Sequence, residues 1–189
     1  MHIRTPIRIS MAAIILAGLI LTACGVSAPA ATGSTTAMTA KPDWFNIQMT
    51  DVRTGQTFTV NDYAGKVVLV ETMATWCITC IEQQVEVKKF ESQVSNPKDL
   101  VVISLDTDLN EDAATLKEYA NSYGFDWHFA ISPLEVDKAL GNLYSAEFLN
   151  PPLAPMLFVD RHGSVYSLPF GTVKKATALQ DTLTPHLAQ

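Results

Sequence analysis

The sequence predicts an α/β domain in which helices flank a mixed central sheet. Strand-like and helix-like segments alternate along the chain, as in domains of this class. Two of the strand-like runs, 66–72 and 100–105, are continuous and rich in β-branched residues, which is typical of strands covered on both faces. Hydrophobic residues make up 48% of the chain, enough to form a core.

The first half of the domain should hold three strands and one long helix. Short strands are predicted at 45–49 and 57–60, and the buried strand 66–72 follows them. From Cys77 to about residue 94 the pattern becomes helical. The apolar residues at near-helical spacing in this stretch are Ile81, Val85 and Val94. Asn96-Pro97 should end the helix.

The second half continues the alternation after the strand 100–105. A helix is predicted at 111–123, with Glu111 and Asp112 in its first turn and Gly124 as its terminator. A third central strand should follow at 127–131. Ser132-Pro133-Leu134-Glu135 is a capping signature for a helix that reaches about Tyr144. The last predicted elements are a hairpin of strands 156–159 and 164–168 and a helix at 172–187.

Residues 1–23 have the pattern of an export signal. Arg4 and Arg8 precede an apolar run at 11–21, which is shorter than the roughly 20 residues that span a bilayer. The run ends in Leu21-Thr22-Ala23-Cys24-Gly25, which resembles the lipobox of bacterial lipoproteins. The resemblance implies that Cys24 carries a diacylglyceryl group and begins the mature chain. The alternative is a transmembrane anchor or a signal cut elsewhere, and either case places the folded part outside the cytoplasm, against a membrane.

One domain should follow the signal after a short tether. Residues 24–42 comprise the lipidated cysteine and a small, polar, aperiodic stretch that cannot bury enough surface to fold. The domain then covers 43–189. Removal of 1–23 takes away Arg4 and Arg8, so the net charge moves from −6 to −8. This acidic balance argues against a nucleic-acid partner and against electrostatic adhesion to anionic lipid.

The two cysteines of the domain carry its most informative motif. Cys77 and Cys80 are separated by two residues, follow a buried strand and open a helix. A helix N-terminus favours a thiolate, the attacking species in disulfide exchange. We expect Cys77 to be the exposed nucleophile and Cys80, one turn deeper, to resolve the mixed disulfide.

Two other uses of the motif are disfavoured. A structural zinc site needs two further ligands, and the domain has no second cysteine pair and no recognisable ligand spacing among His128, His162 and His186. A purely structural disulfide would close too small a loop to constrain the unfolded chain much.

Residues 70–80 resemble the active-site segment of thioredoxin-fold proteins, especially the TlpA/ResA-like extracytoplasmic branch. The resemblance continues through Asp106, the helix 111–123 and Trp127, where that branch has an extra helix and strand. Residues 154–163 are similar to the family's cis-proline strand and the turn after it. The resemblance therefore implies a thioredoxin-like fold with the extra helix–strand insert of this branch.

The resemblance also assigns roles to two residues beside the cysteines. It implies that Pro155 is cis, faces the cysteine pair, shapes the substrate groove and discourages metal binding by the thiols. An ordinary trans proline is the alternative. Trp76 would shield the edge of the site, or would simply pack in the core.

Glu71 departs from the family pattern. It lies six residues before Cys77, where thioredoxins have an aspartate and the TlpA/ResA-like branch more often has an asparagine. A buried carboxyl there should have a raised pKa and could accept and return the proton of Cys80. The alternative is a glutamate that reaches a polar partner or lies at a sheet edge.

Two further departures concern the neighbourhood of the cysteines. The branch often has an acid three positions after the second cysteine, where Gln83 stands here. Ile78 and Thr79, between the cysteines, provide neither a charge nor a histidine. We therefore expect a reducing or mildly oxidising protein.

The predicted function is a membrane-anchored thiol–disulfide oxidoreductase that reduces or exchanges disulfides of extracytoplasmic proteins. By resemblance, its tasks could include keeping the haem-binding thiols of apocytochrome c, or the thiols of a copper-site protein, reduced. A membrane electron-transfer protein would recharge it. No cofactor is expected beyond the redox-active disulfide Cys77–Cys80.

Two rival functions share the fold. A copper-binding metallochaperone of the Sco type could use soft thiolates, with Met73 and Met156 near the motif. Sco-like proteins, however, have three residues between the cysteines and a distant histidine. A peroxiredoxin is disfavoured because Ala74 lacks the hydroxyl expected three residues before a peroxidatic cysteine.

Overall fold

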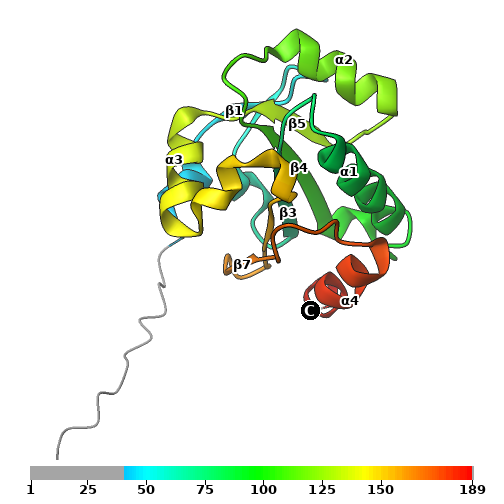
Figure 1. Ribbon diagram of the computed structural model, residues 1–189. Helices are drawn as coiled ribbons and strands as arrows, with labels where there is room; N and C mark the ends of the chain where they lie inside the picture. The colour runs from blue at the N-terminus through cyan, green and yellow to red at the C-terminus, as the bar shows by residue number, and fades with distance from the viewer. Residues whose placement is uncertain (1–40, 189) are drawn as a thin grey trace, which may run out of the picture. The chain divides into compact units, whose positions relative to one another are not determined.

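A five-stranded mixed sheet forms the centre of the protein, in a computed structural model that describes residues 41–188 (Figure 1). The strand order is β5-β4-β3-β6-β7. The strands are β3 (Val67–Met73), β4 (Leu100–Asp106), β5 (His128–Ile131), β6 (Met156–Val159) and β7 (Val165–Ser167). β3, β4 and β5 run parallel, whereas β6 and β7 run antiparallel to their neighbours. The predicted mixed sheet is confirmed.

Helices cover both faces of this sheet. Three of them, α1 (Ile78–Glu91), α2 (Ala113–Tyr123) and α4 (Ala176–Leu187), pack on one face, and α3 (Leu134–Leu143) lies on the other (Figure 1). The side chains of β3 point alternately to these two faces. Leu69 and Met73 belong to the core cluster of the first face, and Val68 and Val70 to that of the second. Glu71 therefore points toward the α1 face.

The segment before β3 differs from the prediction. The strand expected at 45–49 is a 3-10 helix, η1 (Asp43–Asn46), followed by the two-residue strand β1 (Met49–Thr50). Trp44 and Phe45 are adjacent and pack in the same core cluster, which the alternation of a strand does not allow. The strand expected at 57–60 is confined to β2 (Thr57–Phe58).

A capping box follows the short strand β2. The Thr59 side chain accepts a hydrogen bond from the Asp62 N–H, and Asp62 accepts one from the Thr59 N–H. These bonds start the 3-10 helix η2 (Val60–Tyr63).

The buried face of α1 differs from its apolar stripe. Its buried residues are Cys80, Gln83, Gln84, Val87 and Phe90. Of the apolar residues at near-helical spacing, Val85 is 39% exposed, and Ile81 and Val94 are partly buried and pack against the core cluster. The two glutamines occupy buried positions because hydrogen bonds satisfy most of their polar atoms.

Three boundaries in the second half shift for local reasons. Asp112 caps α2 by accepting a hydrogen bond from the Thr115 N–H, so Glu111 lies before the helix, while Gly124 (φ 64°) ends the helix as predicted. Pro133, not Ser132, is the N-cap of α3, because the Ser132 hydroxyl donates to Asp137. α4 begins at Ala176 instead of residue 172.

The place of the third parallel strand was predicted wrongly as well. β5 lies at the edge of the sheet and not at its centre. Three further 3-10 helices were not predicted: η3 (Pro97–Asp99), η4 (Ala146–Leu149) and η5 (Pro151–Leu153).

Between residues 41 and 188 no helix is long and apolar enough to cross a membrane. The predicted signal at 1–23, Cys24 and most of the tether lie outside the described residues.

Candidate functional site

Cys77 and Cys80 lie where β3 passes into α1, as the sequence predicts. Cys77 is the N-cap of α1, and its Sγ accepts a hydrogen bond from the Cys80 N–H at 3.1 Å. The two sulfurs form a disulfide with an S–S distance of 2.20 Å. The unpaired backbone N–H groups at this helix end favour negative charge, so the first thiolate of the reduced pair is stabilised here.

The expected exposure of Cys77 is wrong. Cys77 and Cys80 are each only 2% exposed, and both belong to the core cluster beneath α1. Cys80 Sγ also lies 3.4 Å from the carbonyl oxygen of Pro151 in η5. Both sulfurs of the disulfide are therefore packed against protein, so a partner must reach Cys77 over the side chains around it.

Those surrounding side chains form an apolar rim. The rim, defined here as Trp76, Ile78, Leu109 and Leu149, is 58%, 73%, 82% and 45% exposed, respectively. Trp76, Leu109 and Leu149 line a groove of about 310 Å³. Its other lining residues are Pro151, Thr107, Asp108 and Asn110, so the groove lies next to the cysteine pair and neither cysteine lines it. Trp76 Nε1 donates to Asp108 at 2.6 Å, which fixes the indole beside the groove. Trp76 is thus not a core residue.

Glu71 lies in a buried polar cluster under α1. It is 3% exposed and stands opposite Ser104 in the β3–β4 register, where the Ser104 hydroxyl donates to Oε1 at 2.5 Å. The Trp127 indole N–H donates in turn to the Ser104 oxygen. Glu71 therefore does not reach a sheet edge; it is held in the interior.

The environment of this carboxyl shifts its pKa strongly. Burial raises the pKa of Glu71 to about 7, and the hydrogen bond from Ser104, the amide of Gln84 and the charge of Lys174 only partly oppose the rise. Nε2 of Gln84 is not aligned for a full hydrogen bond, while its Oε1 accepts from the Tyr119 hydroxyl. A group with this pKa can take up and release a proton near neutral pH.

Lys174 joins three parts of the site. Its Nζ donates to the carbonyl of Ala154, the residue before Pro155, although the side chain is nearly buried. Its backbone N–H and carbonyl both bond the amide of Gln83 on α1. Burial lowers the pKa of Lys174 to about 8, and the charge of Glu71 opposes this shift.

Pro155 is buried between η5 and β6, and its carbonyl accepts a hydrogen bond from the Thr72 N–H at 3.2 Å. Ala154 before it adopts a left-handed backbone with φ 48°. The hydrogen bond places Pro155 beside the end of β3. A direct contact with the sulfurs, as the resemblance implies, stays a prediction.

A second group of acids lies at the end of β4. Asp106 is 1% exposed, and Glu111 accepts hydrogen bonds from the backbone N–H and the hydroxyl of Thr75. Burial and the adjacent Glu111 carboxyl raise the pKa of Asp106 well above its ordinary value.

Only some of the residues around the cysteine pair could be identified from the sequence. Asp106 was singled out only as part of the family resemblance, and Glu111 only as a helix residue. Lys174 carried no local signal. The one sequence feature that indicated buried polar groups here was the adjacent pair Gln83-Gln84, because this helix was expected to pack on the sheet.

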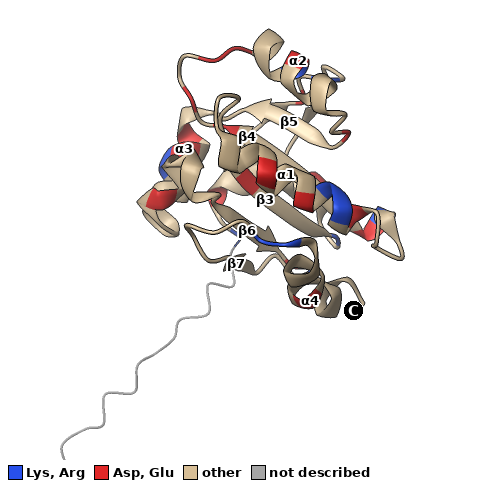
Figure 2. Cartoon of the chain, turned by 45° about the vertical axis from the view of Figure 1, so that its right-hand side comes forward, with Lys and Arg blue, Asp and Glu red and all other residues tan. Residues whose placement is uncertain are grey.

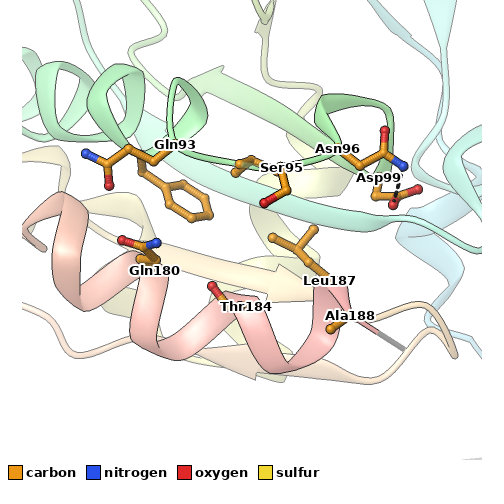
Figure 3. Close-up of a pocket in the computed structure, with 10 residues that line it drawn as sticks. Gln93, Ser95, Asn96, Asp99, Gln180, Thr184, Leu187 and Ala188 are labelled. Carbon is orange, nitrogen blue, oxygen red and sulfur yellow. Dashed lines mark hydrogen bonds between the residues drawn. The ribbon is translucent and has the colours of Figure 1, made fainter.

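Away from the cysteines, a cavity of about 160 Å³ opens between the end of α1 and α4 (Figure 3). Its walls include Phe90, Val94 and Leu187, and none of the predicted site residues. Among the described residues no group of three or more His, Cys, Asp or Glu side chains could hold a metal ion.

Comparisons with known proteins agree with this architecture. A family model described as Redoxin matches residues 25–181. No curated protein sequence matches the chain.

Solved structures show the same fold at low sequence identity. The chain is similar to a putative protein disulfide isomerase from Bacteroides thetaiotaomicron, with TM-score 0.62 and 18% identity over 76% of this chain and 86% of that one. A secreted thiol-disulfide isomerase from Corynebacterium glutamicum gives TM-score 0.63 and 14% identity over 79% and 86%. A secreted disulfide oxidoreductase from Mycobacterium tuberculosis gives TM-score 0.53 and 17% identity over 76% and 96%.

Proposed function

Because the chain belongs to the Redoxin family and is a thiol–disulfide oxidoreductase, we propose that it reduces or exchanges disulfides of extracytoplasmic proteins from a lipid anchor. The observation that carries the proposal is the Cys77–Cys80 disulfide at the start of α1, the helix whose residue Gln84 lies beside the buried Glu71. An apolar rim around the disulfide suits a protein partner better than a small polar one.

The reductive cycle uses two thiolate attacks. Cys77 attacks one sulfur of the partner disulfide, so that a mixed disulfide forms and the partner's other sulfur leaves as a thiolate. Cys80 then attacks Cys77 Sγ and releases the second partner thiolate. The pair loses two electrons, the partner gains them, and a membrane electron-transfer protein restores the reduced pair.

Glu71 serves the second attack as a proton relay. Gln84, which lies beside Glu71, follows Cys80 by four residues and so shares its face of α1. Glu71 accepts the Cys80 proton, which makes the resolving thiolate, and returns it when the pair is reduced again. Its pKa of about 7 lies close enough to the ordinary thiol pKa of about 8.5 for transfer in both directions.

The rim and the proline complete the site. Trp76, held by Asp108, shields the edge of the disulfide, and Pro155, as the family resemblance implies, shapes the surface on which the partner backbone lies. We expect no bound cofactor. Met73 and Met156 are fully buried, which argues against their use as copper ligands in a Sco-type chaperone.

Lipidation of Cys24 would hold the domain at the membrane, close to its reductant. Each buried methylene adds about 0.8 kcal/mol of membrane affinity, and stable anchoring takes more than one chain, which a diacylglyceryl group supplies. Cys24→Ser should move the protein from the membrane fraction to the soluble fraction. Retention of the variant in the membrane would contradict the anchor.

The proposed activity is tested by trapping the partner. Cys80→Ser blocks resolution, so mixed disulfides at Cys77 should accumulate in cells and identify the partner by mass spectrometry. Apocytochrome c or a copper-site protein among the captured proteins would assign the pathway. Cys77→Ser is the matched control and should trap far less. A Cys80→Ser protein that captures nothing, together with a wild type that holds stoichiometric copper, would overturn the proposal.

A further inference from the structure

The chain between β7 and α4 fastens the loop before Pro155 in place. Figure 2 shows the basic stretch of this connection where it leads into α4. The Gly171 N–H donates to the carbonyl of Leu153 at 2.8 Å, and Lys174 Nζ donates to the carbonyl of Ala154. These two carbonyls belong to the residues that precede Pro155, so the connection contacts the loop directly.

The same connection is bonded to the helix that begins at the cysteine pair. Lys174 donates its backbone N–H to Oε1 of Gln83 at 2.6 Å, and Nε2 of Gln83 donates to the Lys174 carbonyl at 3.1 Å. One turn farther along α1, Glu86 accepts from the Ala176 N–H at 2.9 Å. Gln83 follows Cys80 by three residues, so Lys174 joins the loop to the first turns of α1.

The Gln83 amide suits this double contact. An amide donates and accepts at once, whereas an ionised carboxyl only accepts. A glutamate at this position would therefore leave the Lys174 carbonyl without its donor, in a place where both residues are buried.

Lys174 and Ala154 are each in a costly state that their contact compensates. Ala154 has φ 48°, which is unfavourable for a residue with a Cβ; its N–H donates to the Pro151 carbonyl at 2.8 Å, and its own carbonyl accepts from Lys174. Lys174 is 8% exposed, and an apolar side chain in place of a buried charge is often neutral or stabilising. Stability alone does not account for a buried ammonium here, and the group that its Nζ bonds is the loop.

We propose that Lys174 and Gln83 form a brace that positions the loop of Ala154 and Pro155 relative to the cysteine pair, so that a partner polypeptide meets the disulfide in a fixed orientation. Both are positioning residues, which act through the loop and α1 and not on the reacting sulfurs. The inference rests on the proposed function, which gives the surface at Pro155 to the partner backbone. A small disulfide has no polypeptide backbone to place, so the brace matters for a protein disulfide and not for a small one.

The first test is hydrogen exchange of backbone amides in the oxidised full-length protein, followed by NMR. In Lys174→Met, the N–H groups of Ala154 and Gly171 should exchange about tenfold faster, because a hydrogen bond from a charged donor no longer stabilises the closed loop. The amides of β4 are the internal reference. Lys175→Met removes the same charge from the adjacent side chain, which is 70% exposed, and should leave the exchange of both amides unchanged.

The second test compares the rates at which the reduced protein reduces insulin and hydroxyethyl disulfide. Lys174→Met should lower the ratio of the insulin rate to the small-disulfide rate by about tenfold, because a small misplacement of a binding element costs at least a factor of this order. Loss of the Lys174 charge also raises the pKa of Glu71, but that change affects both reactions alike and leaves their ratio unchanged. Lys175→Met should keep the wild-type ratio.

A second variant keeps the inference open to refutation if Lys174→Met fails to fold. Gln83→Met retains the charge of Lys174 and removes both bonds to its backbone, so it carries the same two predictions. Unchanged exchange at Ala154 and Gly171, an equal loss of rate with both disulfides, or the same loss in Lys175→Met would overturn the inference. A wild type that reduces neither disulfide would contradict the proposed function, and hydrogen exchange would still decide whether the brace holds the loop.

Discussion

Replacing Glu71 with glutamine should stabilise the folded protein at alkaline pH and leave its stability nearly unchanged at acidic pH. The carboxyl is 3% exposed, and burial raises its pKa from 4.5 to about 7. Between these values the folded state keeps a proton that the unfolded state has released, so the free energy of unfolding falls as pH rises. The difference of roughly 2.5 pKa units corresponds to about 3 kcal/mol.

The measurement is urea unfolding of the oxidised wild type and Glu71→Gln at about pH 4 and about pH 8. Glutamine cannot ionise and can still accept the Ser104 hydrogen bond, so the variant should be up to about 3 kcal/mol more stable at the higher pH only. Asp137, a buried acid whose raised pKa owes nothing to Glu71, titrates alike in both proteins and cancels in the difference. An equal stability difference at both pH values would refute the reasoning.

The same variant should lose activity. If Glu71 relays the Cys80 proton, Glu71→Gln should slow reduction of a partner disulfide by about 10²-fold or more, and Glu71→Asp should recover part of the rate. A more stable protein with slower exchange is the pattern that a relay predicts. A merely structural carboxyl would show the gain in stability without the loss of rate.

Other substitutions test separate parts of the molecule. Trp76→Ala should change the free energy of unfolding by less than about 0.5 kcal/mol, because the indole is exposed, and yet lower the rate with a protein partner; an unchanged rate would remove Trp76 from the site. Asp112→Ala should cost about 1 kcal/mol in urea unfolding through loss of the α2 cap. Phe90→Ala, which empties a fully buried position between α1 and α4, should cost about 3–5 kcal/mol. Lys174→Met should raise the pKa of Glu71 further in a carboxyl titration, since it removes the positive charge that opposes the shift.

Local patterns predicted the framework of the site well. The continuous apolar runs became β3 and β4, and Cys77 caps the helix that the motif was expected to open. Each of these features is encoded in a short stretch of sequence, in which the secondary-structure propensity and the hydrophobic pattern predict the same element. The weaker predictions were those that depended on packing, such as the strand at 45–49 and the central place of the strand at 127–131.

The exposure of the cysteines illustrates this limit. A cysteine that begins a helix is expected at the surface, yet Cys77 is 2% exposed. Its disulfide partner Cys80 is likewise 2% exposed, and the Pro151 carbonyl oxygen in η5, far along the chain, lies 3.4 Å from Cys80 Sγ. No spacing near the motif encodes that contact.

By itself, the sequence determined the chemistry of this protein: a cysteine pair at the start of a helix, behind a buried strand that carries one carboxyl. Only the tertiary structure decided how that chemistry is controlled. The β3–β4 register places Ser104 opposite Glu71, Lys174 lies in the segment before α4, and Glu111 accepts hydrogen bonds from Thr75. These partners are distant in sequence, and the pKa of a buried group depends on the groups that the fold places beside it.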